Sequence, residues 1–324
     1  MTICNSNLTF VIQGAIDFSP HKEAFVTLDL IHSLRSYFPE SRIILSTWEG
    51  SDISAFKAIT NFEYILNEDP GPTTAKNAKP NNFNRMVKST LFGLESVNSE
   101  FVCKLRTDML IESSALIPIY NKLARLTYDP KLRVVTKPVL TISYSSVNPL
   151  TSSSKLLFHP CDWLFLGRLP DIYDFFDGVE LNESDADYLL THDINVSDSN
   201  YLSRFRAEQM IFINFLERKG LKIDMSSYED YSKDKLDYSS QIITNNLIIV
   251  DGNMIGARSL KHPNISRFTP TKINYLDWKI MRLRYIKRQK TISSFLVFFI
   301  VVYCGFLNLG FKFLSKIKSI IKAI

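Results

Sequence analysis

Short apolar runs of strand length alternate with segments of helical periodicity through the first part of the chain. Strands are predicted over 8–16, 42–48 and 63–67. A helix is predicted from Pro20 to Pro39, and a shorter one over 52–59. Because strands and helices take turns, the pattern indicates an α/β protein with a parallel sheet.

The same alternation continues, less regularly, to about residue 250. Further helices are predicted over 84–97, 114–126, 169–176 and 203–219. Further strands are predicted over 101–108, 132–136, 139–143, 159–167 and 242–250. The polar stretches at 143–154 and 180–200 are predicted to be loops. The pattern predicts one α/β domain over 1–278, with a mainly parallel sheet flanked by helices.

The end of the chain has a different composition. Residues 279–324 contain ten Lys or Arg and no Asp or Glu, whereas 1–278 contain 28 basic and 33 acidic residues. Residues 292–311 are almost wholly apolar and long enough to cross a bilayer as a helix. Residues 312–324 place apolar side chains on one face and lysines away from it. We expect a hydrophobic and amphipathic helical tail that associates with a membrane.

Two alternatives for the tail stay open at this point. The apolar stretch either spans once or lies in the cytoplasm-facing leaflet, because both of its flanks are basic and give no orientation. It could also be a helix buried in the fold or at a dimer contact. The mildly acidic body does not favour a nucleic-acid partner.

Other sequence signals narrow the class of protein. The four cysteines are scattered without a CxxC pair, which indicates reduced thiols in a cytosolic protein. The amino terminus has no signal-peptide pattern. The chain also lacks a dinucleotide fingerprint, a Walker loop and a Gly-x-Ser-x-Gly elbow. These absences count against dehydrogenases, kinases and hydrolases.

The strand at 101–108 ends in the charged residues Lys104, Arg106 and Asp108. Strand tips at the carboxyl edge of an α/β sheet are common ligand sites. Three charges at one tip are costly unless they face a ligand, a metal or each other. We therefore predict a nucleotide-sugar site in which Asp108 holds Mg²⁺ or Mn²⁺ and Arg106 or Lys104 faces phosphate. The alternative is an internal ion pair between Asp108 and Arg106.

Further candidates for donor binding lie at other turns. Gln13 and Gly14 follow the first strand, Asp69 follows the third, and Asn84 and Arg85 open a helix. Helix amino termini attract anions, and an arginine there can bind phosphate with its two-pronged guanidinium. Each position also has a plain structural explanation: a strand-ending turn, an Asp-Pro turn, or a helix cap with a surface arginine.

Acceptor chemistry is expected from residues 159–210. Glu208, on a helix with apolar neighbours, is a candidate general base, and a salt bridge to Arg204 is its alternative. Asp162 is a rival for that role or an acceptor-binding group, and Trp163 either stacks on a sugar or packs in the core. His262 could complete a metal site with Asp108, although a surface or core histidine is the commoner case.

The sequence resembles the WavE lipopolysaccharide-synthesis family over about 10–260, with the tail outside the resemblance. The matching pieces are Val11-Ile12-Gln13-Gly14, Ser33–Pro39, Ile43–Trp48, Asp69-Pro70-Gly71, Asn81–Arg85, Lys104–Asp108, Asp162-Trp163 and Glu208-Gln209. The resemblance implies a Rossmann-like fold similar to GT-A glycosyltransferases, with a metal-linked diphosphate site. Those enzymes usually carry Asp-x-Asp where this chain has Arg106-Thr107-Asp108. The missing carboxylate puts the metal in doubt. Arg106 could neutralise the diphosphate where a metal ion otherwise would.

The resemblance and the residues together predict a glycosyltransferase. It would move a sugar from a nucleotide donor to a lipid-linked, lipopolysaccharide or capsular glycan, at the cytoplasmic face of the bacterial inner membrane. Two alternatives remain: a non-catalytic, membrane-tethered scaffold of a polysaccharide complex, and a sugar-phosphate transferase.

Overall fold

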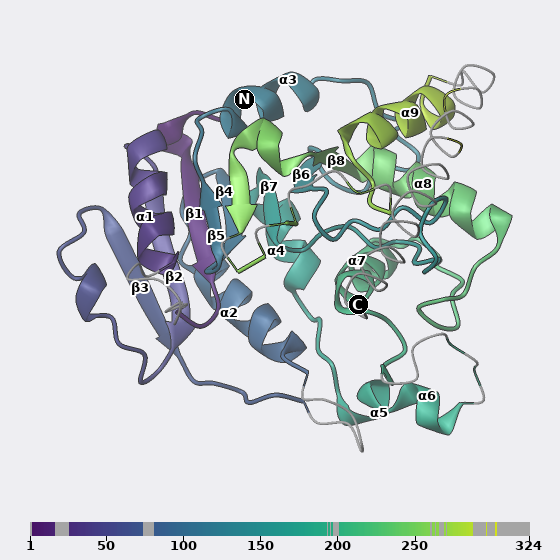
Figure 1. Cartoon of the computed structure of the whole chain (residues 1–324), viewed down its shortest axis with the longest axis horizontal. Helices are drawn as coiled ribbons and strands as arrows, with labels where there is room; N and C mark the ends of the chain where they lie inside the picture. The colour runs from purple at the N-terminus through teal and green to yellow at the C-terminus, as the bar shows by residue number, and fades with distance from the viewer. Residues whose placement is uncertain are drawn as a thin grey trace, which may run out of the picture.

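The computed structural model describes residues 2–16, 26–73, 81–192, 201–259 and 271–287, with isolated positions at 194, 196, 261–262, 264–265, 269, 296 and 302. A seven-stranded sheet in the order β3-β2-β1-β4-β7-β6-β8 crosses the molecule (Figure 1). Helices flank this sheet, and most neighbouring strands run parallel, which confirms the predicted fold class.

The first half of the sheet is wholly parallel. It consists of β1 (Leu8–Gln13), β2 (Arg42–Trp48), β3 (Phe62–Asn67) and β4 (Phe101–Arg106). In the register of these strands, Gln13 lies opposite both Ser46 and Arg106. The carboxyl ends of these strands therefore lie along one edge of the sheet.

The second half of the sheet contains one strand that runs antiparallel to its neighbours. Strand β7 (Leu164–Arg168) runs antiparallel to both β4 and β6 (Val139–Ile142), and β8 (Leu247–Val250) runs parallel to β6. A small second sheet pairs β5 (Met109–Ile111) with β9 (Ala257–Ser259). This pairing returns a late part of the chain to the end of β4.

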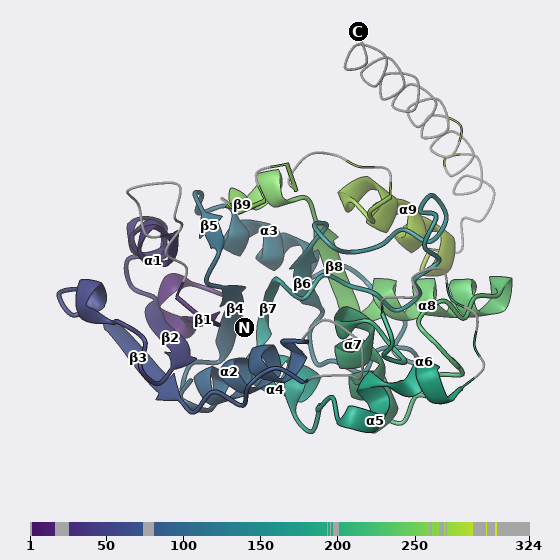
Figure 2. The same cartoon turned by 60° about the horizontal axis from the view of Figure 1, so that its bottom comes forward.

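Helices cover both faces of the sheet (Figure 2). The helices α1 (Val26–Tyr37) and α3 (Leu116–Leu123) lie on one face, and α2 (Phe83–Glu95) and α4 (Leu169–Phe176) lie on the other. Helix α2 approaches β1 closely at Gly93, where a Cβ atom would lie 2.4 Å from Val11 Cγ1. The absent side chain thus lets the last turn of α2 pack directly on β1.

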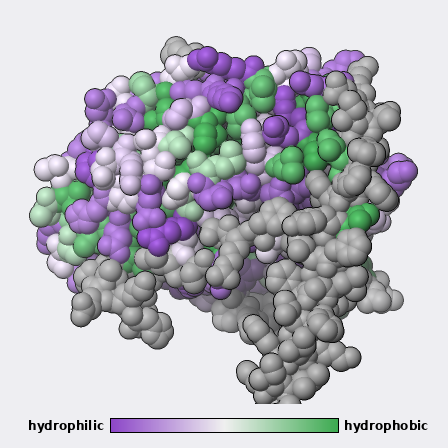
Figure 3. All heavy atoms as spheres, turned by 45° about the horizontal axis from the view of Figure 1, so that its top comes forward, coloured by the Kyte–Doolittle hydropathy of each residue, from purple (hydrophilic) through white to green (hydrophobic). Residues whose placement is uncertain are grey.

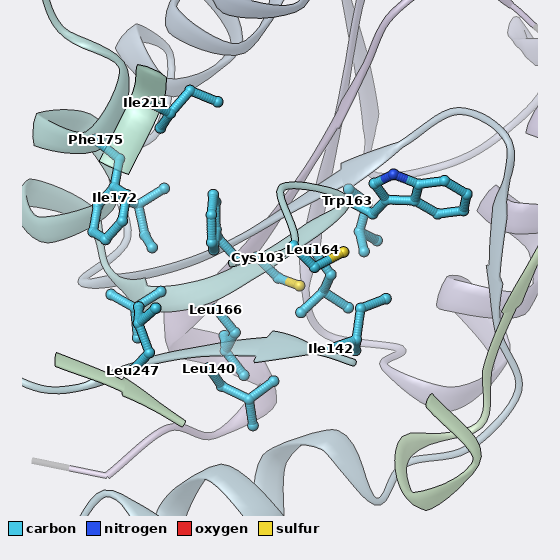
Figure 4. Close-up of a cluster of buried hydrophobic side chains, with 14 of the residues drawn as sticks. Cys103, Leu140, Ile142, Trp163, Leu164, Leu166, Ile172, Phe175, Ile211 and Leu247 are labelled. Carbon is cyan, nitrogen blue, oxygen red and sulfur yellow. The ribbon is translucent and has the colours of Figure 1, made fainter. Parts of the chain in front are cut away.

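The core forms where strands and helices pack together. Figure 4 shows buried side chains around Cys103, Leu140 and Leu166 of the sheet, together with Phe175 of α4 and Ile211 of α7 (Ala207–Arg218). The remaining helical elements are η1 (Asn5–Asn7), η2 (Ser54–Phe56), α5 (Glu183–Ala186), α6 (Tyr188–Thr191), α8 (Lys233–Asn246), η3 (Gly252–Ile255) and α9 (Tyr275–Tyr285).

Several predicted elements differ from the structure. Residues 132–136 form no strand, because their backbone groups form hydrogen bonds with a side chain and not with a neighbouring strand. The Asn246 amide donates to the Leu132 carbonyl, and the Val134 N–H donates to Asn246 Oδ1, both at 2.8 Å. Residues 242–246 are the last turn of α8, so that strand begins at Leu247. The helix predicted over 52–59 is only the turn η2, and the predicted loop at 180–200 contains α5 and α6.

Helix α9 crosses position 278, where we expected the domain to end. Its Trp278 is fully buried and donates from Nε1 to the Leu247 carbonyl at 2.8 Å. From 288 onward the predicted tail lies outside the described residues, apart from positions 296 and 302. None of the helices in the described ranges has the length and apolar character that crossing a membrane requires.

Candidate active site

The ends of the parallel strands border an open pocket of about 520 Å³. Its lining comes from the ends of β1, β2 and β4, the turn after β3, the start of α2 and a late residue, Lys261. Six predicted donor-site residues meet here: Gln13, Gly14, Asp69, Arg85, Arg106 and Asp108. The pocket thus occupies the edge of an α/β sheet at which ligands are commonly bound.

Gln13 and Gly14 shape the floor of the pocket. The Gln13 side chain is buried and accepts a hydrogen bond of 2.8 Å from the Ser89 hydroxyl of α2. Gly14 has a φ of +114°, a conformation that L side chains rarely adopt. The chain can therefore turn away directly after β1 and leave the space above Thr107 open.

At the tip of β4, Arg106 and Asp108 form a two-pronged ion pair. Arg106 Nε and Nη2 donate to the two carboxylate oxygens of Asp108 at 2.9 and 2.8 Å. The guanidinium also lies 4.3 Å from the centre of the Trp163 ring. Burial acts to lower the pKa of Arg106, but the hydrogen bonds and charge of Asp108, together with Asp162 and Cys161, outweigh burial and the pKa is raised. Arg106 is thus held as a fixed cation beside the pocket.

A second pair of the same kind lies across the pocket. Arg85, in the first turn of α2, donates to both carboxylate oxygens of Asp69 at 2.7 and 2.6 Å, and its Nη1 donates to Asn82 Oδ1 at 2.9 Å. The hydrogen bonds from Arg85 lower the pKa of Asp69. The pair is about one-third exposed, so opening it towards a ligand costs little, about 1 kcal/mol or less.

Lys261 gives the pocket a net positive charge. Strand β9 pairs with β5, directly after Asp108, and Lys261 follows two residues beyond Ser259. Within the described part of the chain, Lys261 forms no ion pair. Because each arginine is matched by an aspartate, this lysine leaves the lining with a formal charge of +1, which suits an anion.

Two predicted donor-site residues lie elsewhere. Lys104 is fully buried: its Nζ donates to the Asp162 carbonyl at 2.5 Å and lies 5.4 Å from the Phe176 ring centre. It shares a strand face with Arg106 but lies two residues deeper, beneath the pocket. The side-chain amide of Asn84 donates to the Leu181 carbonyl and accepts from the Leu181 N–H, both at 2.8 Å. In this structure, neither side chain reaches the pocket.

The predicted acceptor-side residues form a second, buried group. Glu208 Oε2 lies 3.4 Å from His159 Nε2, with side-chain exposures of 18% and 7%. Burial raises the pKa of Glu208, Asp162 adds to the rise, and His159 acts against it. Arg204, the expected partner, instead donates to the carbonyls of Met225 and Ser226. Glu208 therefore has the raised pKa that suits a general base.

Trp163 packs beside Arg106. Its ring contacts Arg106 on the pocket side, packs edge-on against Tyr144, and has its centre 5.7 Å from that of the His262 ring. Asp162 next to it acts electrostatically on both Lys104 and Arg106. The buried, packed ring matches the core alternative for Trp163.

In this structure Asp108 presents no free carboxylate oxygen to a divalent metal. Mg²⁺ at a phosphate site is usually held by one or two carboxylates together with waters and the substrate phosphates. Both oxygens of Asp108 accept from Arg106, and no cluster of three His, Cys, Asp or Glu side chains occurs among the residues that the structure describes. His262 contacts Trp163 and is not among the described residues that line the pocket. Arg106 occupies the flank of Asp108 where a cation would bind.

The sequence reasoning missed several residues of the two groups. Trp48 and Met86 line the pocket, and their position at a strand end and a helix start is a signal that could have found them. His159 is the partner of Glu208, and Lys261 completes the charge of the pocket. For Lys261 there is no local signal, because only the β5–β9 pairing brings it to the site.

A family model described as WavE lipopolysaccharide synthesis matches residues 8–319. The match therefore runs past residue 260, into the tail that we had placed outside the resemblance. None of the curated proteins compared matches the chain.

Among solved structures, similarity is weak. The galactosyltransferase LgtC, solved with donor and acceptor sugar analogues, is 10% identical over 64% of this chain and 69% of its own, with a TM-score of 0.34. HddC from Yersinia pseudotuberculosis is 11% identical over 52% of this chain and 79% of its own, with a TM-score of 0.33. A 4-diphosphocytidyl-2C-methyl-D-erythritol synthase from Anaerococcus prevotii is 13% identical over 73% of this chain and 97% of its own, with a TM-score of 0.34. Such low scores carry no functional argument.

Proposed function

Because this chain belongs to the WavE lipopolysaccharide-synthesis family, we propose that it is a glycosyltransferase whose donor is a nucleotide sugar bound in the pocket at the ends of β1–β4. One observation carries the proposal: the pocket joins Arg85, Arg106 and Lys261 at the carboxyl edge of the parallel strands. Its volume is within the usual range for small-molecule sites.

The three cations would bind the donor diphosphate. When the glycosidic bond to the diphosphate breaks, negative charge grows on the leaving oxygens, and fixed donors beside them stabilise that charge. Arg106 is held in place by Asp108 and Trp163, so it needs no rearrangement. Arg85 can exchange Asp69 for phosphate, because a carboxylate and a phosphate can each accept two parallel hydrogen bonds from a guanidinium. No metal ion is needed in this arrangement to place positive charge at the diphosphate.

Glu208 would act on the acceptor side, with Asp162 as its neighbour. A general base must remove the proton of the acceptor hydroxyl as that oxygen attacks the anomeric carbon. The raised pKa of Glu208 suits this role, and His159 orients the carboxylate from 3.4 Å. The acceptor would be a lipid-linked, lipopolysaccharide or capsular glycan, at the cytoplasmic face of the inner membrane, with the tail holding the enzyme there.

Donor binding is tested by melting the full-length protein with UDP, GDP, CMP and nucleotide sugars, with and without Mn²⁺. A ligand that binds only the native state raises the melting temperature. We expect a rise with one nucleotide diphosphate that is the same without Mn²⁺ and is lost in Arg106→Gln and Arg85→Gln. Arg42→Gln is the matched control, because Arg42 forms a similar pair with Glu63 outside the pocket.

A Glu208→Gln variant separates chemistry from donor binding. We expect it to keep the donor-induced rise in melting temperature and to lose most of the transfer rate, about 100-fold or more. Transfer at the wild-type rate would remove Glu208 from the mechanism.

The scaffold alternative has one observation in its favour, which is that both aspartates of the pocket are already paired internally. A folded protein that no nucleotide stabilises would support the scaffold and contradict the donor site.

A further inference from the structure

A second cavity lies on the opposite side of the fold from the parallel strand ends. It has a volume of about 380 Å³ and is bordered by α8, α9 and the segment 147–158. Most of its lining is apolar, including Leu156, Phe158, Leu236, Ile243 and Ile280. The proposed glycosyl transfer does not use this cavity.

The rim of the cavity combines exposed apolar groups with cations. Leu150 and Tyr231 are 43% and 41% exposed. Figure 3 shows apolar side chains, in green, on the side of the molecule that carries α8 and α9. Lys233 and Arg284 line the same opening, and Lys155 lies 5.9 Å from the Tyr231 ring centre.

The rim charges are only partly balanced. Within the lining, Asp237 is the one acidic residue; it accepts from the Tyr285 hydroxyl at 2.5 Å and lies 3.7 Å from Arg284. Lys233 and Arg284 against Asp237 leave the lining with one positive charge in excess, and Lys155 lies beside it. A hydrocarbon-lined cavity with a positive mouth is complementary to a molecule with an apolar chain and an anionic head.

The position of the cavity along the chain also points to a membrane. Tyr285 lines the cavity, and the apolar stretch 292–311 begins seven residues later. Seven residues span at most about 25 Å, whatever their conformation. A bilayer that contains this stretch would therefore lie within about 25 Å of the cavity.

We propose that the cavity between α8 and α9 binds the hydrocarbon chain of an anionic phospholipid, with the phosphate at Lys155, Lys233 and Arg284. The apolar stretch of the chain itself is a weaker candidate for this space. Its flanks, 286–291 and 312–324, contain only basic charged residues, so the positive rim would repel them. An anionic head group is attracted by the same rim.

The proposal is tested with a photoreactive phospholipid. Full-length protein is mixed with zwitterionic vesicles that carry a diazirine-labelled phosphatidic acid, irradiated and digested, and the labelled peptides are identified by mass spectrometry. We expect label on 147–158, α8 and α9. Replacing two cations, in Lys233→Gln with Arg284→Gln, should reduce that label by about tenfold or more. The control, Lys222→Gln with Lys279→Gln, has the same charge change away from the cavity and should keep the label.

A cavity-filling variant, Met281→Trp, gives an independent readout, because it removes space and leaves the charges unchanged. It should lower the label on α8 while the melting temperature shows that the protein stays folded. Label confined to 288–324 would overturn the proposal and favour simple tail insertion. Equal labelling by a diazirine-labelled phosphatidylcholine would overturn the anionic head group.

Discussion

At the residue scale, burial separates side chains that look alike in the sequence. Lys104 and Arg106 are both cations of β4, yet Lys104 is fully buried and Arg106 lines the pocket. Burial lowers the pKa of Lys104 to about 8, Asp162 partly offsets this, and Arg106 adds to the lowering. A lysine with such a pKa makes stability depend on pH in alkaline solution.

The direction of this pH dependence follows from the number of protons that the native and unfolded states bind. Between about 8 and 10.5, the ordinary pKa of lysine, the unfolded chain binds more protons at this position than the native protein does. The free energy of unfolding contributed by Lys104 should therefore rise with pH across that window, by about 3 kcal/mol in all. Urea unfolding at a series of pH values checks this.

The readout is the difference between wild type and Lys104→Met, which cancels the titration of other groups. Lys88→Met, at an exposed site on α2, is the control and should show the wild-type pH dependence. A constant difference between wild type and Lys104→Met would contradict the lowered pKa.

At the element scale, the hydrophobic pattern predicted the first three strands and the helices α1 and α2 well, because each has a clear period and a clear stop. The pattern failed where side chains from distant segments decide backbone structure. Asn246 takes the backbone groups of residues 132–134, and no local property of those residues shows it. Helix α9 was missed because its apolar residues merge into the basic, apolar tail.

Helix α9 should contribute strongly to stability despite its place at the edge of the tail. Trp278→Ala removes a fully buried ring and its hydrogen bond to Leu247, and we expect a loss of about 3–5 kcal/mol in the free energy of unfolding. Leu276→Ala, in the same helix but 55% exposed, should change it by about 0.5 kcal/mol or less. Urea unfolding compares the two. Similar losses in both variants would show that α9 does not pack as described.

At the scale of the whole molecule, charge is divided unequally. The tail from Lys279 has ten cations, whereas the body is mildly acidic. We predict that the protein binds anionic vesicles and that binding weakens between about 0.1 and 1 M salt, where the Debye length falls from about 10 to 3 Å. Co-sedimentation with vesicles measures this. Equal binding to zwitterionic vesicles at low salt would show that apolar contact alone is sufficient.

The sequence by itself determined the fold class, the strand tips that hold charged residues, and the family. These depend on local periodicity and on short motifs, which neighbouring residues carry. Only the tertiary structure decided which of the candidates meet. Arg85 and Arg106 line the same pocket, whereas Lys104 is buried beneath it. Glu208 lies beside His159, and the pairing of β9 with β5 places Lys261 in the pocket lining. The physical reason is that burial and distance between segments far apart in the chain follow from packing, which no local pattern contains.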